Sequence, residues 1–345
     1  MNLKISVAIT TYNGEKFIKE QLESILKQKR KPDEIIVCDD CSTDLTLDIV
    51  KNTLKNSDIY YKIIKNPNNL GFVKNFEKAI SLCKGDIIFI SDQDDFWLNE
   101  KIEKTEKIFL NDNNCMLVFS NMEIVNENLS TIGYNTWDLL GINEHLTDFD
   151  ILKLISQSKD IFNGCAMIIR KTVKQFIFPF SEKWGHDLWI IANVALFYDN
   201  SIKFIPDKLV LHRRHLFNTS KVNLLGTNNF EKNKQHNYFK KIKKICTNMK
   251  ENIKFNKERY NAFLIHIKEK QKMLNRNKYI IIKDVYEYYD RRLKMYDKNI
   301  FYGFFEILQA LKKGLYYKYN NSYYKLAFKD VLSLIFIKFF THKNL

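Results

Sequence analysis

Short apolar runs alternate with amphipathic segments throughout the first 90 residues. Four runs rich in branched apolar residues predict strands, at 5–10, 34–38, 59–64 and 87–90. The segments between them carry apolar residues at helical spacing and predict helices, at 15–28, 45–54 and 72–83. Strands that alternate with helices pair in parallel, because each helix returns the chain to the same end of the sheet. The sequence therefore predicts an α/β fold with a doubly wound, mostly parallel sheet.

Three carboxylates follow the last of these strands. The run Ile87–Ile90 leads through Ser91 to Asp92, Asp94 and Asp95. Like charges this close repel one another, so a cation or the hydrogen-bond donors of a ligand must satisfy them. Such oxygen ligands suit Mg²⁺ or Mn²⁺, which bind one or two carboxylates together with substrate phosphates. The pattern predicts a site for a metal and a diphosphate, and the alternative is a solvated acidic turn.

Polar residues also follow the first two strands. Thr10 and Tyr12 lie at the end of the first strand, and Asp40 lies at the end of the second. In doubly wound sheets, ligands bind outside the carboxyl ends of the strands. Together with the acidic cluster, three strand ends carry residues that suit ligand binding, and this favours a functional site.

Four segments lie in register in the first half of the chain, VAITTYNG, VCDDCSTD, NNLGFVKNF and ISDQDDFW. Through these segments the chain resembles the nucleotide-sugar transferases of glycosyltransferase family 2 over residues 3–220. DQDD followed by an aromatic residue and Trp is most similar to the rhamnosyltransferase-like branch. The resemblance implies a GT-A fold, a Rossmann-like mostly parallel sheet flanked by helices, and a metal-dependent inverting transfer. The implied donor is a dTDP- or UDP-sugar, with dTDP-rhamnose as one candidate, and the implied acceptor is a glycan or a lipid-linked oligosaccharide.

The resemblance assigns roles at the donor site. Thr10 and Tyr12 match the turn that holds the nucleobase, and the Tyr12 ring can stack on that base. Asp40 matches the carboxylate that accepts the ring N–H of a pyrimidine. Lys74 and Asn75 match a pair near the donor phosphates. Judged alone, Tyr12 is an ordinary rim aromatic residue and Lys74 a solvated helix charge.

The resemblance also distributes roles within the acidic cluster. It places Asp92 near the ribose and the metal, and it makes Asp94 a ligand of the divalent ion, Mn²⁺ or Mg²⁺. Asp95 is expected to support both from behind. These assignments apply only to the positions of this chain that match the family segment.

A basic segment at 211–218 resembles an Arg-x-His…Asn segment of the rhamnosyltransferase-like relatives. Arg213 and Arg214 can bind phosphate in bidentate fashion. His215 can serve as a third metal ligand or contact the diphosphate. The alternative is a basic surface turn. The Gln-x-x-Arg-Trp sequence that is typical of processive synthases is absent.

The acceptor side is expected at 160–169 and 184–189. The family places an acceptor-facing loop at the first segment. In the second, Asp187 is the candidate general base, which takes the proton of the acceptor hydroxyl as that oxygen attacks the anomeric carbon. His186 departs from the commonest family pattern and is the second candidate base, since imidazole accepts protons near neutral pH. The alternative is an acid in the first turn of a helix, where the helix dipole favours it.

The charge divides the chain into two expected domains, 1–220 and 221–345. Residues 1–220 hold 27 Lys and Arg against 30 Asp and Glu, whereas residues 221–345 hold 28 against 10. The second part predicts a basic helical region with helices near 232–274, 279–297 and 301–316. A last segment, Tyr323–Phe340, mixes apolar residues with Lys and fits an anionic membrane surface. Its alternatives are plain structural helices and nucleic-acid binding, for which no motif is present.

The remaining features favour a cytoplasmic enzyme. Lys4 precedes the first strand, so no signal peptide is expected. Six scattered cysteines are expected to be reduced and structural. The protein is expected in the cytoplasm, with peripheral contact to the inner membrane face. Two rival functions remain. The first is a sugar-nucleotide-binding protein or a nucleotidyltransferase, although Thr10–Gly14 lacks the Gly-rich basic loop of the latter. The second is nucleic-acid binding through residues 221–345.

Overall fold

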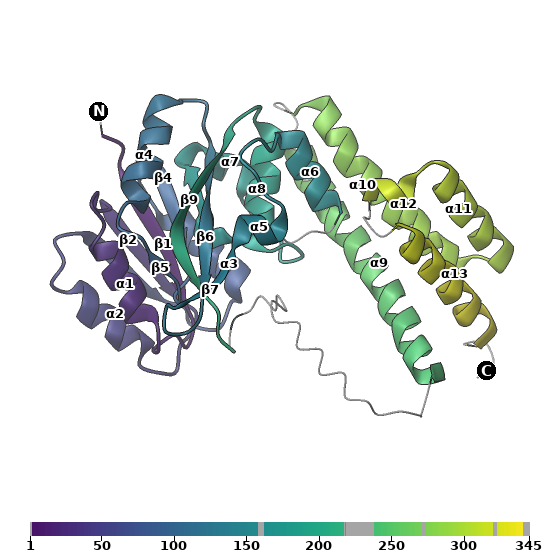
Figure 1. Cartoon of the computed structure of the whole chain (residues 1–345), viewed down its shortest axis with the longest axis horizontal. Helices are drawn as coiled ribbons and strands as arrows, with labels where there is room; N and C mark the ends of the chain where they lie inside the picture. Colours follow the sequence, from purple (N-terminus) through teal and green to yellow (C-terminus); the bar gives the residue numbers. More distant parts are fainter. Residues whose placement is uncertain are drawn as a thin grey trace. The chain divides into compact units, whose positions relative to one another are not determined.

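The computed structural model describes residues 2–157, 162–216, 218, 238–270, 274–319 and 323–340 (Figure 1). The described residues form two compact units. The first draws on the ranges 1–152, 160–216 and 273–275, and the second on 153–159, 217–272 and 276–345. The boundary expected from composition, 218–229, lies outside the described residues apart from Asn218.

The first half of the sheet is parallel, as predicted. Its strands are ordered β3-β2-β1-β4, with bounds β1 Ile5–Thr11, β2 Glu34–Asp39, β3 Tyr60–Lys65 and β4 Ile87–Ser91. The connecting helices are α1 Ile18–Leu26, α2 Thr46–Leu54 and α3 Phe72–Leu82. Strands β1, β2 and β4 are buried along their whole length, which explains their continuous apolar runs. The α/β prediction is confirmed.

The second half of the sheet is mixed. Strand β8 (Met167–Arg170) pairs antiparallel with β4 and with β6 (Leu117–Val125), and β9 (Ile202–Arg213) runs parallel to β6. Two short strands complete it, β5 (Phe96–Trp97) and β7 (Thr131–Asn135). Strand β5 follows the acidic cluster at once and pairs antiparallel with the end of β9, where Phe96 lies opposite Leu211. This pairing brings residues more than 110 positions apart to one edge of the sheet.

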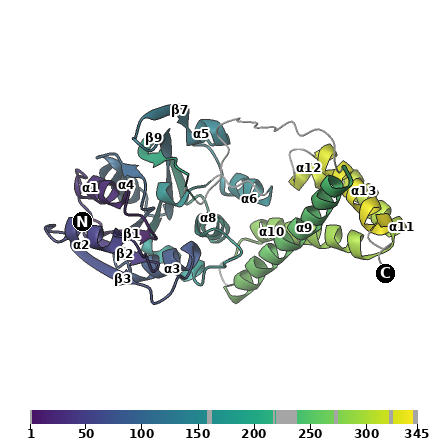
Figure 2. The same cartoon turned by 90° about the horizontal axis from the view of Figure 1, so that it is seen from below.

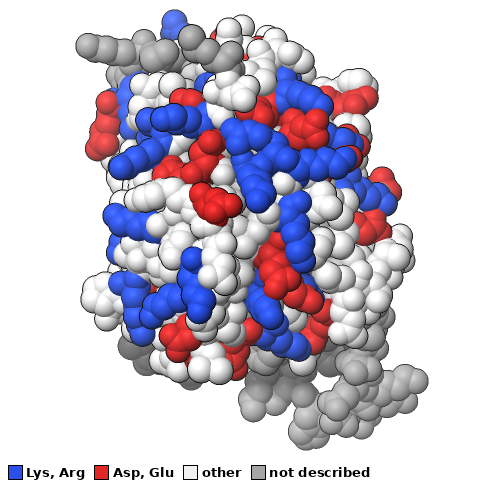
Figure 3. All heavy atoms as spheres, turned by 90° about the vertical axis from the view of Figure 1, so that its left-hand side faces the viewer, with Lys and Arg blue, Asp and Glu red and all other residues white. Residues whose placement is uncertain are grey.

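Helices cover both faces of this sheet. Helices α1 and α4 (Lys101–Asn111) lie on one face, and α3 and α8 (His186–Phe197) lie on the other (Figures 1 and 2). Helix α8 is buried almost all round, so its sequence has no polar face. Shorter helices at the periphery are α5 (Thr136–Leu140), α6 (Asp148–Ser156) and α7 (Lys174–Ile177). Figure 3 shows basic and acidic side chains interspersed over one face of the molecule.

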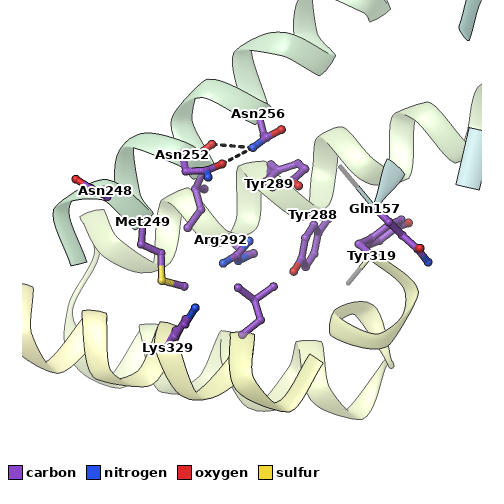
Figure 4. Close-up of a pocket in the computed structure, with 12 residues that line it drawn as sticks. Gln157, Asn248, Met249, Asn252, Asn256, Tyr288, Tyr289, Arg292, Tyr319 and Lys329 are labelled. Carbon is purple, nitrogen blue, oxygen red and sulfur yellow. Dashed lines mark hydrogen bonds between the residues drawn. The ribbon is translucent and has the colours of Figure 1, made fainter. Parts of the chain in front are cut away.

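The C-terminal unit is helical, as predicted. Its helices are α9 Tyr238–Glu269, α10 Arg276–Asp297, α11 Ile300–Lys312, α12 Leu315–Tyr319 and α13 Tyr323–Phe340. Helix α9 packs on α10 and α13, and α11 packs on α10 and α13. The start of the first expected helix, 232–237, lies outside the described residues. A cavity of about 390 Å³ lies in this unit, with Arg292 drawn between Asn252 and Lys329 (Figure 4).

Helix α13 is built into the core of this unit. Its Ala327, Asp330 and Leu334 are buried. The segment expected to lie on a membrane therefore uses one face for packing and leaves a mixed stripe that includes Lys325, Phe328 and Leu332 exposed. No helix among the described residues combines the length and the apolar character needed to cross a bilayer.

Candidate active site

The turn after β1 presents Tyr12 to solvent. The Tyr12 side chain is 50% exposed, whereas Thr10 is buried beside Cys38 of β2. Gln93, within the acidic segment, holds this turn at two points: its Oε1 accepts from Tyr12 N at 2.9 Å, and its Nε2 donates to Tyr12 O at 3.1 Å. A Cβ on Gly14 would lie 2.2 Å from Gln93 Oε1, so a larger residue at this position would displace the Gln93 side chain. The exposed Tyr12 ring is thus carried on a fixed backbone.

Asp40 is buried and holds the loop before α3. Its Oδ1 accepts from Asn66 Nδ2 and from Leu70 N, both at 2.8 Å, and its Oδ2 accepts from Gly71 N at 2.9 Å. A carboxylate oxygen has two acceptor positions, so Oδ2 retains capacity for one more donor. The structure assigns Asp40 a structural duty that the sequence did not indicate, and its contact with a base stays a prediction.

Lys74 and Asn75 are both engaged by protein groups. Lys74 Nζ donates to Glu77 Oε2 at 2.6 Å and to Phe180 O at 2.8 Å. Asn75 is buried, and its Nδ2 donates to Cys38 O at 2.9 Å. Asn75 therefore fixes α3 against the end of β2. The predicted phosphate contact of this pair stays a prediction, and it would require Lys74 to leave its present partners.

The structure brings the acidic cluster together with Asp187. Burial raises the pKa of Asp92 well above its usual range, and the charges of Asp95, Asp94 and Asp187 raise it further. Asp187 stands at the start of α8, more than 90 residues along the chain, so only the fold places its charge near Asp92. Four carboxylates that repel one another in this way call for a bound cation or ligand donors.

Asp94, a predicted metal ligand, lies beside His215, which was predicted as a third ligand or a diphosphate contact; both roles stay predictions. Asp94 Oδ2 lies 2.8 Å from His215 Nε2, and the His215 ring rests against Phe17 with centroids 4.7 Å apart. Both side chains are largely buried, at 16% and 5% exposure. Carboxylate oxygens suit Mn²⁺ and Mg²⁺, and imidazole nitrogens bind divalent transition metals, so the pair can contribute ligands to a divalent ion.

Behind this pair, Asp95 anchors the end of β9. Its Oδ1 accepts from Arg213 N at 3.1 Å and lies 2.9 Å from His212 Nδ1. Burial alone would raise the pKa of Asp95, but the charge and hydrogen bond of His212 hold this pKa below its usual range. Cys165 Sγ lies 3.9 Å from the same His212 nitrogen. Asp95 thus supports the cluster from behind, and the bond to His212 fixes the segment that carries His215.

Lys101 is a buried cation that the sequence analysis did not single out. Its Nζ donates to Cys165 O at 2.6 Å and lies 4.2 Å from the Trp97 ring centroid. Burial lowers the pKa of Lys101 to about 8, although the charges of Cys165, Asp95 and Asp92 oppose this. The sequence signal that could have indicated its burial is its position at the start of a helix, four residues after the buried Trp97.

The two arginines of the basic segment point to different places. Arg213 is buried, and its guanidinium donates to Asp94 O, Glu127 O and Glu20 Oε2. Burial lowers the pKa of Arg214, while the charges of Cys165, Asp95 and Asp94 counter it, so its charge lies near the cluster. Arg213 is the last residue of β9, and Arg214 follows it. Phosphate binding stays a prediction for both, and for Arg213 it would break three bonds.

His186 packs in the interior, whereas Asp187 lies partly exposed beside it. The His186 ring stacks on Phe76 with centroids 3.9 Å apart, and a Cβ on Gly164 would lie 2.3 Å from His186 Nε2. Asp187 Oδ1 accepts from Leu188 N at 2.8 Å in the first turn of α8. The first two residues of the expected acceptor loop, 160–161, lie outside the described residues. Of the two candidate bases, Asp187 has the access that an acceptor needs.

Comparison with known proteins identifies the family of this chain. The profile of glycosyl transferase family 2 matches residues 6–177. WfgD of Escherichia coli, a UDP-Glc:alpha-D-GlcNAc-diphosphoundecaprenol beta-1,3-glucosyltransferase, is 27% identical over 67% of this chain and 83% of its own length. WfaP of the same species, which carries the same activity in its name, is 31% identical over 54% of this chain and 68% of its own.

A third relative and a solved structure extend the comparison. The dTDP-rhamnosyl transferase RfbG of Shigella flexneri is 38% identical over 31% of this chain and 39% of its own length. The structure of Staphylococcus aureus TarS residues 1–349 with UDP-GlcNAc aligns with a TM-score of 0.50 at 24% identity. That match spans 64% of this chain and 62% of the TarS chain, and it supports the fold alone. The chain therefore belongs to glycosyltransferase family 2 and is a glycosyltransferase with a GT-A fold.

Proposed function

We propose that this chain is a metal-dependent, inverting glycosyltransferase. It moves a hexose from a pyrimidine nucleoside diphosphate to a hydroxyl group of a lipid-linked glycan. The observation that carries the proposal is the convergence of Asp92, Asp94, His215 and Asp187 at the carboxyl ends of the strands. Ligands of doubly wound sheets bind at that edge.

The donor is proposed to be a UDP- or dTDP-sugar. Two relatives are named as UDP-Glc-dependent enzymes and one as a dTDP-rhamnosyl transferase, so rhamnose is one candidate among the hexoses. Both nucleotides carry a pyrimidine base with a ring N–H donor. The exposed Tyr12 ring offers a stacking surface for that base, and the spare acceptor position of Asp40 Oδ2 suits its N–H.

Asp94, His215 and Asp92 are proposed to hold Mn²⁺ or Mg²⁺. The 2.8 Å approach of Asp94 to His215 and the raised pKa of Asp92 both fit a site that a cation stabilises. A bound ion supplies charge neutralisation for the departing diphosphate. Arg214, whose charge lies near the cluster, is the proposed protein cation on the phosphate side.

Asp187 is the proposed general base. It takes the proton from the acceptor hydroxyl as that oxygen forms a bond to the anomeric carbon. The bond from that carbon to the diphosphate oxygen breaks on the opposite side, so the configuration inverts and no enzyme nucleophile is needed. His186 is the weaker candidate, because its ring is stacked on Phe76 and shielded by Gly164.

The acceptor is proposed to be a glycan on a lipid diphosphate. The names of WfgD and WfaP specify a GlcNAc-diphosphoundecaprenol acceptor. An enzyme that uses such an acceptor must work at a membrane surface, which fits a cytoplasmic protein with peripheral contact to the inner face. We expect no nucleic-acid partner.

Titration calorimetry of UDP and dTDP, with and without Mn²⁺, tests the donor site. We expect binding that requires the metal and that falls at least ~100-fold in Asp94→Ala. A matched control is Asp207→Asn, which removes an exposed carboxylate paired with Lys104 and should bind as the wild type does. Metal-independent binding, or an Asp94→Ala variant that binds normally, would overturn the metal assignment.

A second variant separates chemistry from binding. Asp187→Asn should bind donor with near-normal affinity but transfer sugar at least ~100-fold more slowly, since a positioned base contributes roughly 10²–10⁴-fold. Single-turnover transfer to a synthetic lipid diphosphate acceptor measures this rate. Normal transfer by Asp187→Asn would move the base to another residue, with His186→Gln as the next variant to measure. Donor binding without any transfer in the wild type would favour a sugar-nucleotide-binding protein.

A further inference from the structure

Helix α11 carries an apolar stripe on its outer face. Phe301, Phe305 and Leu308, here called the α11 stripe, are 83%, 56% and 65% exposed. They recur at i, i+4 and i+7, so they form one row along the helix. The opposite face holds the buried Gly303 and Ile307, and a Cβ on Gly303 would lie 2.4 Å from Leu334 of α13. The helix is therefore fixed to its unit by one face and shows apolar side chains on the other.

Lysines follow this stripe at the C-terminal end of α11. Lys312 continues the row four residues after Leu308, and Lys313 follows it; both are exposed. From 298 to 338 the sequence holds seven lysines and two acids. One of those acids is Asp330, which is buried and bound by Arg292. The other is Glu306, which lies on α11 next to Phe305. Lysines therefore outnumber acids in this part of the chain.

We propose that the α11 stripe enters the interfacial zone of an anionic lipid membrane, with Lys312 and Lys313 on the lipid headgroups. This proposal rests on the proposed function, whose acceptor is held in such a membrane. Two contributions make a helix bind to a membrane surface, the burial of apolar area and the attraction of basic side chains to anionic lipids. An apolar helix face flanked by lysines supplies both. The occupant is identified by this charge complementarity.

A second copy of the chain fits the stripe less well. Two such faces would bring their lysines together, and like charges at an interface oppose association. The stripe holds three large side chains, whereas a stable dimer needs about 800 Å² from each partner. Lipid headgroups instead supply the negative charge that the lysines lack.

Helix α13 is less suited to this role than the sequence suggested. The outer row Lys325, Phe328, Lys329 and Leu332 alternates charge with apolar groups. Its inner row holds Asp330 in the core, so the helix is bound into the unit. It can add positive charge to the membrane contact, but the apolar anchor lies on α11, at the edge of the helical unit in both views (Figures 1 and 2).

Vesicle flotation of the full chain tests the proposal. The probe is vesicles with 30% anionic phospholipid, compared with neutral vesicles, at low and high salt. We expect binding to the anionic vesicles that weakens as salt is added. The triple variant Phe301→Ser/Phe305→Ser/Leu308→Ser should lower the partition coefficient at least ~100-fold, because three apolar side chains no longer enter the membrane. Lys312→Gln/Lys313→Gln should lower it ~30-fold on anionic vesicles only.

A matched control removes an exposed aromatic side chain elsewhere. Tyr60→Ser, on β3 of the catalytic unit, changes a side chain that is 59% exposed and should leave flotation unchanged. Wild-type levels of flotation in the triple variant would overturn the proposal. So would a dimer in analytical ultracentrifugation that the triple variant abolishes, because the stripe would then be a protein interface.

The outcome is separable from that of the proposed function. Flotation needs neither donor nor turnover, and the stripe variants should bind UDP or dTDP as the wild type does. Normal flotation with no nucleotide binding would contradict the transferase proposal alone. Nucleotide binding with no flotation would contradict the α11 proposal alone.

Discussion

A buried ion pair holds the helical unit together, and its removal yields a quantitative prediction. Asp330 is fully buried and accepts from Arg292 Nε and Nη2, both at 2.9 Å. It also accepts from the hydroxyl groups of Tyr296 and Tyr316, each at 2.6 Å. Four donors from α10 and α12 thus converge on one carboxylate of α13.

The change Asp330→Ala should destabilise this unit by about 3–5 kcal/mol. It leaves the Arg292 guanidinium, which is 4% exposed, without its counter-charge in the interior. The two tyrosine hydroxyls also lose their acceptor, so the lower figure is a minimum. The control Asp284→Ala breaks the surface pair with Lys318, whose side chains are 38% and 47% exposed, and should cost less than about 1 kcal/mol.

Urea unfolding followed by two signals measures the effect. All four tryptophans, Trp97, Trp137, Trp184 and Trp189, belong to the first unit, so their fluorescence reports on that unit. Circular dichroism at 222 nm also follows the helices of the second unit. With an m-value of about 2 kcal/mol/M, Asp330→Ala should lower the midpoint of the dichroism transition by about 1.5 M or more. A midpoint equal to that of Asp284→Ala would refute the reasoning.

Three further predictions concern the catalytic unit. Burial lowers the pKa of Lys101 from 10.5 to about 8. Between these two pH values the unfolded chain holds the Lys101 proton more tightly than the folded chain does. The free energy of unfolding therefore rises with pH over this range, by about 3 kcal/mol in total. Lys101→Met should remove that rise, which thermal unfolding from pH 7 to 10 measures; an unchanged slope would contradict the buried cation. Gly164→Ala should displace the His186 ring, lower the free energy of unfolding by about 1–3 kcal/mol and slow sugar transfer. Urea unfolding and kcat measure these two effects. Wild-type values of both would mean that the structure accommodates the added methyl group without strain. Gln93→Ala removes both hydrogen bonds to the Tyr12 backbone and should raise the KM for the donor by ~10-fold. An unaltered KM would mean that this turn does not contact the nucleobase of the donor.

Local pattern was sufficient for the parallel half of the sheet and for the strand ends at which the site is predicted. In the first 90 residues, each strand appears as a short apolar run and each helix as apolar residues at helical spacing. Because strands alternate with helices, the strands pair in parallel. The resemblance made Asp94 a metal ligand and His215 a third ligand or a diphosphate contact, and the structure brings these side chains, 121 positions apart, within 2.8 Å of each other; their roles stay predictions. The helical structure of the basic C-terminal region was likewise predicted from its composition.

Tertiary structure alone decided what each polar side chain does. Asp40 and Arg213 had the right residue types for ligands, yet the fold engages them with Gly71 N and with Asp94 O. By its sequence position, Lys101 resembles a charged residue on a helix surface, yet α4 places its side chain in the interior, where it donates to Cys165 O. Sequence periodicity reports which face of an element is apolar, because burial acts on every residue of that face. It does not report which donor meets which acceptor, because those partners come from distant elements and each contact depends on the packing of the whole unit.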